Sequence, residues 1–439
     1  MNPEILIFGA GKSATVLIQY LQSKAVENNW YIVLADGNAE IARNKWNNAS
    51  NGNAIGIDIE NIEERNKLIE RATVVVSMLP PSYHFLVAKD CLKLGKPLFT
   101  ASYVDENLKS LANQIKQKKL FFLSEMGLDP GIDHMSAMQL IHSVQNKGAQ
   151  IISFSSHCGG LIAPESDNNP WHYKISWNAN NIILAGKSGG IYLENGLKKN
   201  LSYSHLFENA PNVEVPGVGK LGYYPNRNSI SYVDTYKLDK VQNFMRTTLR
   251  HPHFLVGWDA IVQLKLTDES PLSLLENTKI KDWIKNHLQK HQLENKYHAF
   301  LQNGIIKNQF EYLEFNSELI IPSDNQNSAA ILQWILEQKW KLQTADKDLV
   351  VMMHEIEYTL NSKKFQVQSY MVQKGKNHTE TAMATTVGLP LAMSVCAYLN
   401  GKIPLTGLHI PTHPSIYEPI LKDLKENGIF FEEITKEIN

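Results

Sequence analysis

The stretch Ile5-Leu-Ile-Phe-Gly-Ala-Gly-Lys-Ser-Ala14 decides the fold of the first part of the chain. Its four apolar residues predict a buried strand, and the apolar positions from Val16 to Leu21 predict a helix. Between them stands a Gly-x-Gly-x-x-Ala turn. In such a turn Gly9 permits a sharp reversal, Gly11 lets a pyrophosphate approach the backbone, and Ala14 lets helix and strand pack closely. The stretch therefore indicates a dinucleotide site at a helix N-terminus, against the alternative of a structural Gly-rich turn.

The next strand, from Trp30 to Ala35, ends at an acid, Asp36. A carboxylate at this position hydrogen-bonds the adenine ribose 2′-hydroxyl and repels a 2′-phosphate. No arginine follows directly, so we expect NAD as the cofactor and rate NADP below it. Arg43 and Lys45 stand a little further on and could soften that preference.

Two further buried strands, Thr73–Leu79 and Pro97–Thr100, end in polar or proline-rich loops. The carboxyl ends of parallel strands form the ligand edge of an open α/β sheet. We therefore expect the cofactor's nicotinamide half to lie near residues of both strand ends, namely Ser77, Leu79, Pro80 and Ser102. Alternation of strand and helix up to residue 127 predicts a Rossmann-type, doubly wound parallel sheet, in the α/β class.

The segment Ser-Glu-Met-Gly-Leu-Asp-Pro-Gly-Ile-Asp-His, residues 124–134, is a turn after which the pattern changes. Its Asp-Pro-Gly suits a turn because proline fixes φ and glycine tolerates positive φ. We predict three domains: a dinucleotide-binding domain (1–127 plus 398–439), an α+β substrate and dimerisation domain (128–253 plus 345–397) and a helical insert (254–344). The bland alternative for residues 124–134 is an ordinary domain-connecting turn.

Composition excludes several classes of function. A net charge of −1 leaves no field to attract nucleic acid or an anionic membrane. The three cysteines are far apart, which argues against a structural zinc, and we expect no metal site. No signal peptide is visible. Residues 379–399 predict an apolar helix, in which Pro390 should cause a kink or separate two helices. Because it contains the proline and small polar residues, we expect it to be buried and not to span a membrane. The default expectation is a cytoplasmic protein without nucleic-acid or membrane partners.

Three cationic residues after the first domain, Lys174, Arg227 and Arg250, lie in separate polar segments. A guanidinium binds a carboxylate through two hydrogen bonds, so these residues predict a clamp for a substrate with several carboxylates. The alternative for each arginine is a surface ion pair. Cys158, before two glycines, is either a thiol facing a cleft or a small residue in a tight bend, and covalent catalysis is not supported.

Several segments together resemble saccharopine dehydrogenases of the L-glutamate-forming type. They are Gly127-Leu-Asp-Pro-Gly-Ile-Asp-His134, Cys158-Gly-Gly-Leu-Ile-Ala-Pro-Glu165, Tyr224-Pro-Asn-Arg-Asn-Ser229 and Thr248-Leu-Arg250. The similarity continues in Asn169-Pro170, Tyr173-Lys174, Ser176-Trp177, Ala382-Met383 and Val387-Gly-Leu-Pro390, so it extends over nearly the whole chain. Two positions depart from the family pattern, because His157 stands where tyrosine is usual and Ile162 where proline is usual.

The resemblance implies a reaction in lysine metabolism. Saccharopine would be oxidised at its secondary amine, and hydrolysis of the imine would give L-glutamate and 2-aminoadipate 6-semialdehyde. The acid at Asp36 matches the NAD-using branch and the degradative direction. The resemblance also implies a homodimer, and a separate lysine-ketoglutarate reductase that would supply saccharopine.

The resemblance assigns residues to both ligands. The cofactor would contact Gly9, Gly11, Lys12, Ser13, Ala14, Asp36, Ser77, Leu79, Pro80, Ser102, Leu128, Pro130 and Gly131. Saccharopine would contact Ser102, Tyr103, Asp129, Cys158, Lys174, Arg227, Thr248, Leu249 and Arg250.

The proton acceptor stays open at this point. Hydride leaves only from carbon beside a neutral amine, so a base or an alkaline medium must first remove a proton. The candidate bases are Asp129, Tyr103 and Cys158, and the substrate's own amino groups are a further alternative. Two rival functions also stay open: a relative acting on another amine–carboxylate adduct such as carboxynorspermidine, and a non-catalytic NAD-sensing protein.

Overall fold

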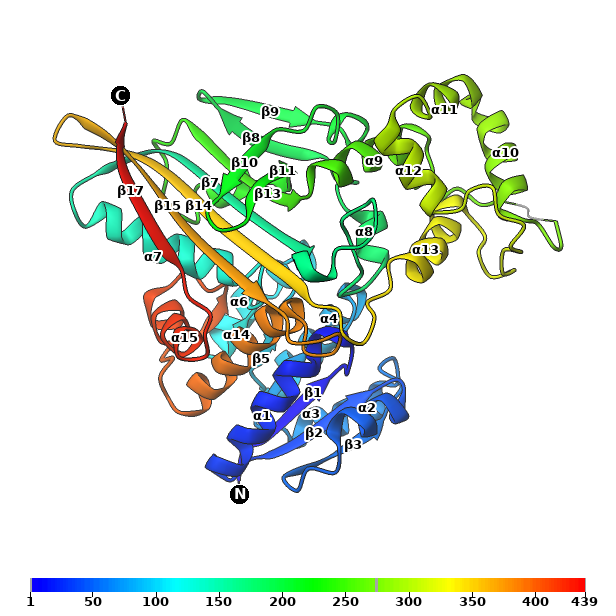
Figure 1. Ribbon diagram of the computed structural model, residues 1–439. Helices are drawn as coiled ribbons and strands as arrows, with labels where there is room; N and C mark the ends of the chain where they lie inside the picture. Colours follow the sequence, from blue (N-terminus) through cyan, green and yellow to red (C-terminus); the bar gives the residue numbers. More distant parts are fainter. Residues whose placement is uncertain (1, 273–274, 439) are drawn as a thin grey trace. The chain divides into compact units, whose positions relative to one another are not determined.

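A computed structural model describes residues 2–272 and 275–438 of the chain. The chain divides into two compact units (Figure 1). The first contains residues 1–150 and 379–433, and the second contains residues 151–378 and 434–439. We call them the nucleotide unit and the sheet unit and describe each by itself.

The nucleotide unit is built on a seven-stranded sheet in the order β16-β6-β5-β4-β1-β2-β3, and all its pairs are parallel. Its strands are β1 (Glu4–Phe8), β2 (Tyr31–Asp36), β3 (Gly52–Gly56), β4 (Val74–Ser77), β5 (Leu98–Thr100), β6 (Phe121–Leu123) and β16 (Gly407–His409). The strand order reverses between β1 and β4, which is the switch point where such sheets bind ligands. The predicted doubly wound parallel sheet, completed by the C-terminal part of the chain, is confirmed.

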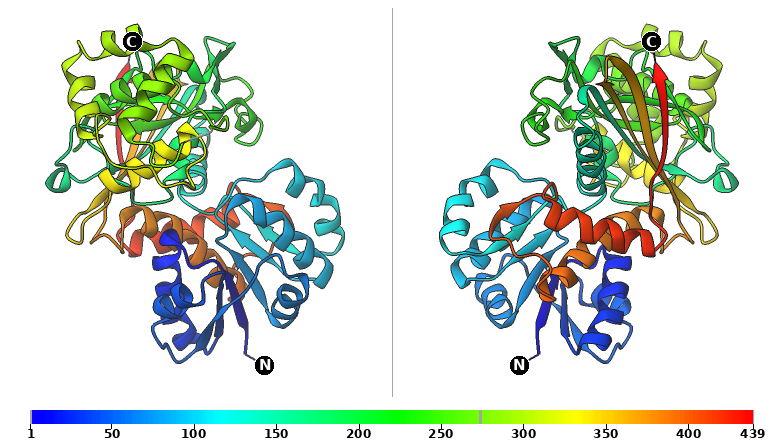
Figure 2. Two further views of the ribbon diagram at one scale, coloured as in Figure 1. Left: turned by 90° about the vertical axis from the view of Figure 1, so that its right-hand side faces the viewer. Right: turned by 90° about the vertical axis from the view of Figure 1, so that its left-hand side faces the viewer.

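Helices cover both faces of this sheet (Figure 2). The chain runs in opposite directions along the sheet on the two sides of the switch point, so right-handed crossovers place the two sets of helices on opposite faces. The helices are η1 (Lys12–Ala14), α1 (Thr15–Asn28), α2 (Ala39–Trp46), α3 (Ile62–Arg71), α4 (Pro81–Leu94), α5 (Glu106–Ser110), α6 (Ala112–Gln117), α7 (Ile132–Gln145), α14 (Ala382–Leu399) and α15 (Pro414–Glu426). Helix α14 packs against α1 and α15, and α3 packs against α4.

Helix α14 alone among the described residues is long and apolar enough to cross a membrane, judged by length and composition. Within the structure 72% of it is buried, as expected for a core helix. Pro390 was expected to kink it or to separate two helices, but α14 is continuous from Ala382 to Leu399. Gly388 packs so tightly on α1 that a Cβ there would lie 2.8 Å from the backbone nitrogen of Leu17.

The sheet unit contains a ten-stranded sheet with the path β10-β11-β13-β7-β14-β15-β17, while β8 pairs with β9, β12 and β13. Its strands are β7 (Gln150–Ile162), β8 (Gly190–Glu194), β9 (Leu197–Leu201), β10 (Asn212–Val215), β11 (Gly219–Pro225), β12 (Arg227–Asn228), β13 (Asn243–Arg250), β14 (Asp348–Leu360), β15 (Lys363–Lys374) and β17 (Glu432–Ile438). Strands β14 and β15 form a long antiparallel hairpin, the pair in yellow and orange (Figure 1).

Helices of the sheet unit share one core with residues from its sheet and loops. They are η2 (Pro164–Ser166), α8 (Asn180–Leu184), η3 (Tyr203–His205), η4 (Ile230–Tyr232), α9 (Pro252–Gln263), α10 (Ile280–His291), α11 (Glu294–Phe300), α12 (Gly304–Tyr312) and α13 (Ser328–Lys339). Trp171 and Tyr224 pack in the same buried cluster as Trp258, Trp283 and Trp340. Because this core is continuous, the predicted helical insert is not separated from the sheet as a unit.

The unit boundaries also differ from the predicted ones. The first falls after Gln150 instead of residue 127, so α7 belongs to the nucleotide unit, and so does α14, from Thr379 onward. Strand β17 instead joins the second sheet. Sequence pattern placed these boundaries where the periodicity changes, whereas helices α7 and α14 follow their packing partners, α15 and α1.

Candidate active site

The Gly-rich turn links β1 to α1 at the switch point. Gly9 has φ of 101°, and a Cβ there would lie 2.7 Å from the carbonyl oxygen of Met78. Gly11 has an ordinary φ of −64°, and no atom lies within 4 Å of where its Cβ would be. Neither conformation nor packing therefore requires glycine at position 11, whereas a pyrophosphate against this backbone would. The turn thus fits the dinucleotide that its motif predicts.

The first turn after Gly11 is a 3-10 turn, η1, which carries Lys12, Ser13 and Ala14 into α1. Ala14 is buried, as close helix–strand packing requires, while Lys12 is exposed and Ser13 half-buried. The two polar side chains are thus accessible beside the turn.

Asp36 is tied to the Gly-rich turn at the end of β2. Its Oδ2 accepts a hydrogen bond from the backbone nitrogen of Ala10 at 2.7 Å, and its Oδ1 accepts one from Asn38 at 2.8 Å. Lys45 donates to the carbonyl oxygen of Gly11 and, at 2.6 Å, to Thr15 Oγ1. Burial lowers the pKa of Lys45 to about 8, against the opposing effect of Asp36. Both Asp36 and Lys45 were considered in the prediction of the cofactor, and in the structure both make hydrogen bonds at the turn.

His84, on α4, joins two of the predicted cofactor residues. Its Nδ1 lies 2.8 Å from Ser77 Oγ and its Nε2 lies 2.6 Å from Ser102 Oγ. Burial lowers the pKa of His84 to about 4, although Asp105 opposes this. A neutral ring donates through one nitrogen and accepts through the other, so it can hold one hydroxyl as donor and one as acceptor. His84 was not among the predicted residues, because nothing in its local sequence distinguishes it from a core histidine.

Tyr103 and Asp129, two of the three candidate proton acceptors, meet in the nucleotide unit. The Tyr103 hydroxyl donates to Asp129 Oδ1 at 3.2 Å, and both side chains are half-buried. A carboxylate held by a phenol has a fixed orientation, which a general base requires. The sequence offered no orienting partner for either residue, and the structure supplies one for both.

Buried acids support the turn that carries Asp129. Gly131 has φ of 147°, and its backbone nitrogen donates to Asp133 Oδ1 at 2.6 Å. His134 Nε2 lies 2.8 Å from Glu125 Oε2. Pro130 and Leu128 are buried in this turn, beside Asp129. These contacts fix the backbone around Asp129, so the segment holds this side chain in a defined position.

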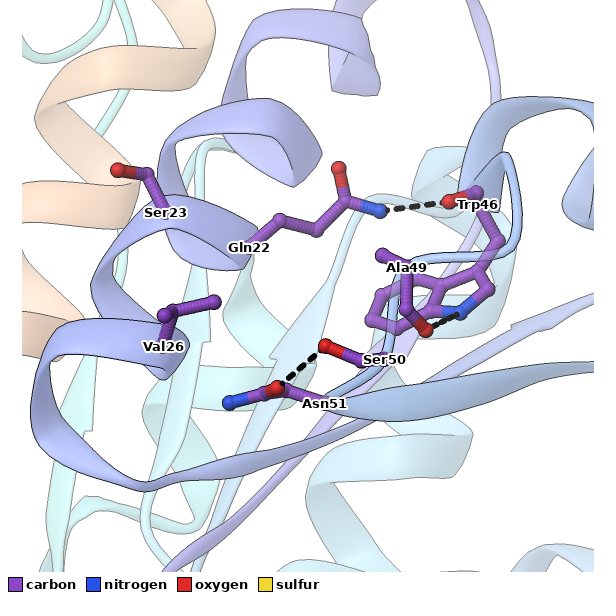
Figure 3. A pocket seen from close by; sticks show the side chains of 7 residues that line it. All are labelled: Gln22, Ser23, Val26, Trp46, Ala49, Ser50 and Asn51. Carbon is purple, nitrogen blue, oxygen red and sulfur yellow. Dashed lines mark hydrogen bonds between the residues drawn. The ribbon is translucent and has the colours of Figure 1, made fainter.

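A pocket in the nucleotide unit contains none of these groups (Figure 3). It is lined by Gln22, Ser23, Val26, Trp46, Ala49, Ser50 and Asn51. Asn51 directly precedes β3, so the pocket lies near the amino ends of the strands. Ligands of such sheets bind at the carboxyl ends, so we do not assign the cofactor to this pocket.

In the sheet unit, three of the motifs singled out in the sequence lie on neighbouring strands. Cys158 on β7 pairs with Thr248 on β13, which in turn pairs with Tyr224 on β11. The tight bend considered for Cys158 is wrong, because β7 runs straight through the two glycines to Ile162. A Cβ on Gly159 would lie 2.5 Å from the carbonyl oxygen of Leu249, so this glycine permits a close approach of β13.

Arg250 is a buried cation without a carboxylate partner among the residues that the structure describes. Its side chain is buried at 5% exposure, and Nη1 donates to the carbonyl oxygen of Leu249 at 2.8 Å. The guanidinium lies over the rings of Tyr173 and Phe254, 5.4 and 5.7 Å from their centroids. Its Nε is buried without a hydrogen-bond acceptor. A buried charge in this state is stabilised by an anion that brings acceptors.

The other two predicted clamp residues differ from Arg250. Lys174 Nζ lies 2.7 Å from Asp346 Oδ2 and both side chains are buried, so this charge is already neutralised within the protein. Arg227 begins β12 with φ of 54° and is exposed. The predicted set therefore contains one buried cation with open bonding capacity, one paired lysine and one surface arginine.

Arg246 was missed by the sequence analysis. It is buried at 3% exposure and lies over the ring of Tyr232, 4.4 Å from the centroid. Side chains four positions apart on a strand share one face, so Arg246 and Arg250 project from the same face of β13, roughly 13 Å apart. Alternation along β13 was the signal that could have found it.

The fold and these groups agree with comparisons to known proteins. A model of the saccharopine dehydrogenase C-terminal domain matches residues 127–429, and a model of the saccharopine dehydrogenase NADP binding domain matches residues 5–123. The chain belongs to the saccharopine dehydrogenase family. Members of this family are oxidoreductases, and the chain carries the family's nucleotide-binding domain.

Curated relatives of the family include fungal and plant proteins. The chain is 29% identical to saccharopine dehydrogenase [NADP(+), L-glutamate-forming] of Schizosaccharomyces pombe, over 98% of both chains. It is 30% identical to alpha-aminoadipic semialdehyde synthase of Arabidopsis thaliana over 97% of its own length, but spans only 44% of that protein. The apo saccharopine dehydrogenase (L-Glu forming) of Saccharomyces cerevisiae matches with a TM-score of 0.89 and 27% identity, covering 99% of this chain and 100% of that one.

Proposed function

We propose that the protein oxidises saccharopine at its secondary amine and yields L-glutamate and 2-aminoadipate 6-semialdehyde. The observation that carries the proposal is Arg250, a buried guanidinium that has no carboxylate partner in the described chain and a buried Nε without an acceptor. Saccharopine has three carboxylates, and one of them would supply these acceptors. Arg246 lies on the same face of β13 and is also buried.

Asp129 is the proton acceptor in this proposal. Its carboxylate takes the proton from the substrate's secondary ammonium, and the neutral amine can then release hydride from the adjacent carbon. Tyr103 positions Asp129 through its hydroxyl, 3.2 Å from Oδ1. Bound nicotinamide supplies the hydride acceptor, and water then adds to the resulting carbon–nitrogen double bond and splits it. Cys158 lies in the middle of β7, paired with Thr248. In this proposal it lines the substrate site and takes no part in proton transfer.

We propose NAD as the preferred dinucleotide. Support comes from Asp36, whose carboxylate is fixed at the Gly-rich turn and would repel a 2′-phosphate. Two observations weigh against it: Lys45 places a cation at the same turn, and the fungal relatives are named as NADP(+) enzymes. Comparing kcat/KM for the two dinucleotides tests this choice, and equal or better efficiency with NADP would overturn it.

Product analysis tests the substrate. Protein, NAD and saccharopine are incubated, and the products are separated and identified by mass spectrometry. We expect glutamate and the semialdehyde in equal amounts, with one reduced dinucleotide for each. Turnover of carboxynorspermidine but not saccharopine would move the assignment to another adduct. Dinucleotide binding without turnover of either compound would indicate a sensor.

A further inference from the structure

A cluster of three histidines in the sheet unit has no part in the proposed reaction. His172 follows the Asn169-Pro170 segment, His251 precedes α9, and His253 lies in its first turn. One potential ligand atom from each lies within 4.8 Å of the other two. His172 and His251 are half-buried, and His253 lies at the surface. The rings of His172 and His251 stack with centroids 3.7 Å apart, and His253 lies 5.2 and 5.0 Å from them.

We propose that His172, His251 and His253 form a binding site for a divalent transition-metal ion, with zinc as the best match. Three imidazoles with water in a fourth position are a known zinc coordination. Zinc–nitrogen bonds of about 2.0–2.1 Å place tetrahedral nitrogens about 3.3 Å apart, so ring rotation must close the cluster from its present spacing. The sequence analysis expected no metal site, because the ligands come from segments about 80 residues apart and not from one motif.

Asp167 completes the arrangement as the carboxylate that orients a ligand. His172 Nδ1 lies 2.6 Å from Asp167 Oδ2. A carboxylate only accepts, so Nδ1 donates to it, and the tautomer with its proton on Nδ1 has the Nε2 lone pair for a metal. The other carboxylate oxygen, Oδ1, is buried and has no hydrogen-bond partner. An uncompensated carboxylate oxygen beside three imidazoles favours a cation.

The two remaining rings are suited to a metal in different degrees. His253 makes no side-chain hydrogen bond in the described structure. His251 Nδ1 accepts from the His253 backbone nitrogen at 3.2 Å, so binding through Nε2 requires a change of tautomer and loss of this cap.

Two features of the structure disfavour metal binding by the three histidines. The positive end of the α9 dipole repels a cation. The stacked rings could also serve only as packing between the 167–172 segment and α9. The negative charge of Asp167 offsets the repulsion by the helix dipole. A role in packing alone leaves the buried Oδ1 of Asp167 unexplained. The site lies beside Arg250 in the chain, so a bound ion would join the 167–172 segment to the end of β13.

Cobalt titration tests the site through a signal that does not involve the enzyme reaction. The full-length protein is stripped with a chelator, dialysed, and titrated with Co²⁺ near pH 7 while visible d–d absorption is followed. We expect one equivalent per chain with the intense bands of a four-coordinate ion, displaced by Zn²⁺. His253→Ala should weaken binding more than about tenfold, and Asp167→Asn by about tenfold.

Matched variants decide between a site and adventitious binding. His298→Ala, at an exposed histidine on α11, should leave the titration unchanged. Zn²⁺ should raise the Tm of the wild type and of His298→Ala, but not that of His253→Ala. Absence of a one-equivalent phase, or equal binding by wild type and His253→Ala, would overturn the proposal. Because no substrate or dinucleotide is present, the outcome is independent of the proposed function.

Discussion

The two units prepare their polar groups in opposite ways. In the nucleotide unit the candidate residues are bonded to one another: His84 joins Ser77 to Ser102, and Tyr103 holds Asp129. In the sheet unit Arg250 is buried with open bonding capacity. The difference teaches that the nucleotide unit is ordered before any ligand arrives, whereas the sheet unit carries a charge that an anionic substrate would complete.

The largest effect is expected for Asp129, the proposed proton acceptor in the nucleotide unit. Asp129→Asn keeps the shape and removes the base, so kcat should fall by about 100–10,000-fold. Tyr103→Phe removes only the orienting hydroxyl and should cost less. Steady-state kinetics with saccharopine measures both. Near-normal kcat in Asp129→Asn would show that another group accepts the proton.

Lys174 provides a buried cation that is already paired. Lys174→Met leaves Asp346 as an uncompensated buried carboxylate, so the free energy of unfolding should fall by about 3–5 kcal/mol. Denaturant unfolding followed by tryptophan fluorescence measures this change. The double variant Lys174→Met with Asp346→Leu should recover most of the loss. Unchanged stability in the single variant would mean that the ion pair is weak.

Arg250 should show the reverse pattern. Arg250→Met removes a buried charge that has no carboxylate partner within the described part of the chain, so the free energy of unfolding should stay equal or rise slightly. In the proposed complex a substrate carboxylate loses its guanidinium partner, so kcat/KM should fall. The fall should correspond to a loss of about 2–5 kcal/mol of transition-state stabilisation. Unfolding and kinetics are measured on the same preparation. Destabilisation with retained activity would contradict a substrate-binding role.

His84 should make the nucleotide unit sensitive to acid. Its folded pKa, about 4, lies below the ordinary value of 6.5, so between these pH values the unfolded chain binds the proton and the folded chain does not. Stability is therefore present above about pH 6.5 and is lost as the pH falls, by about 2 kcal/mol at pH 5. Unfolding at pH 7 and pH 5 should show a smaller difference in His84→Gln. An unaltered difference would show that His84 does not drive it.

The smallest effect is expected at Asp36. Asp36→Ser removes the charge that disfavours a 2′-phosphate, so the ratio of kcat/KM for NADP to that for NAD should rise about tenfold, or about 1.4 kcal/mol. Asp36→Glu keeps the charge and serves as the control. A ratio that does not change in Asp36→Ser would assign cofactor choice to other residues, with Lys45 the first candidate.

Local pattern predicted much of the fold, because the nucleotide unit is made of short repeating steps. The β1–turn–α1 stretch, the parallel strands and the β14–β15 hairpin all have local signatures. The strand through Cys158 and Gly159 does not, because two glycines resemble a turn until Leu249 of β13 lies against them. Tertiary packing, not sequence, put α7 and α14 in the nucleotide unit.

The candidate site was predictable to the extent that its residues lie in motifs. Asp129 and Arg250 were found in this way. The contacts that set them apart from the other candidates could not be predicted from the sequence. Arg250 has no carboxylate partner among the described residues, and this depends on how distant segments pack around it. The pairing of Lys174 with Asp346 and the bridge through His84 are also contacts between segments distant in sequence. Such contacts have no local signal, so sequence yields the candidate residues and structure yields their states.

One measurement tests the central claim most directly: absorbance of the reduced nicotinamide when purified protein, saccharopine and NAD are mixed at mildly alkaline pH. The account predicts a rise that depends on saccharopine, is larger with NAD than with NADP, and is nearly abolished in Arg250→Met. No rise with either dinucleotide, in a protein that still binds NAD, would contradict it.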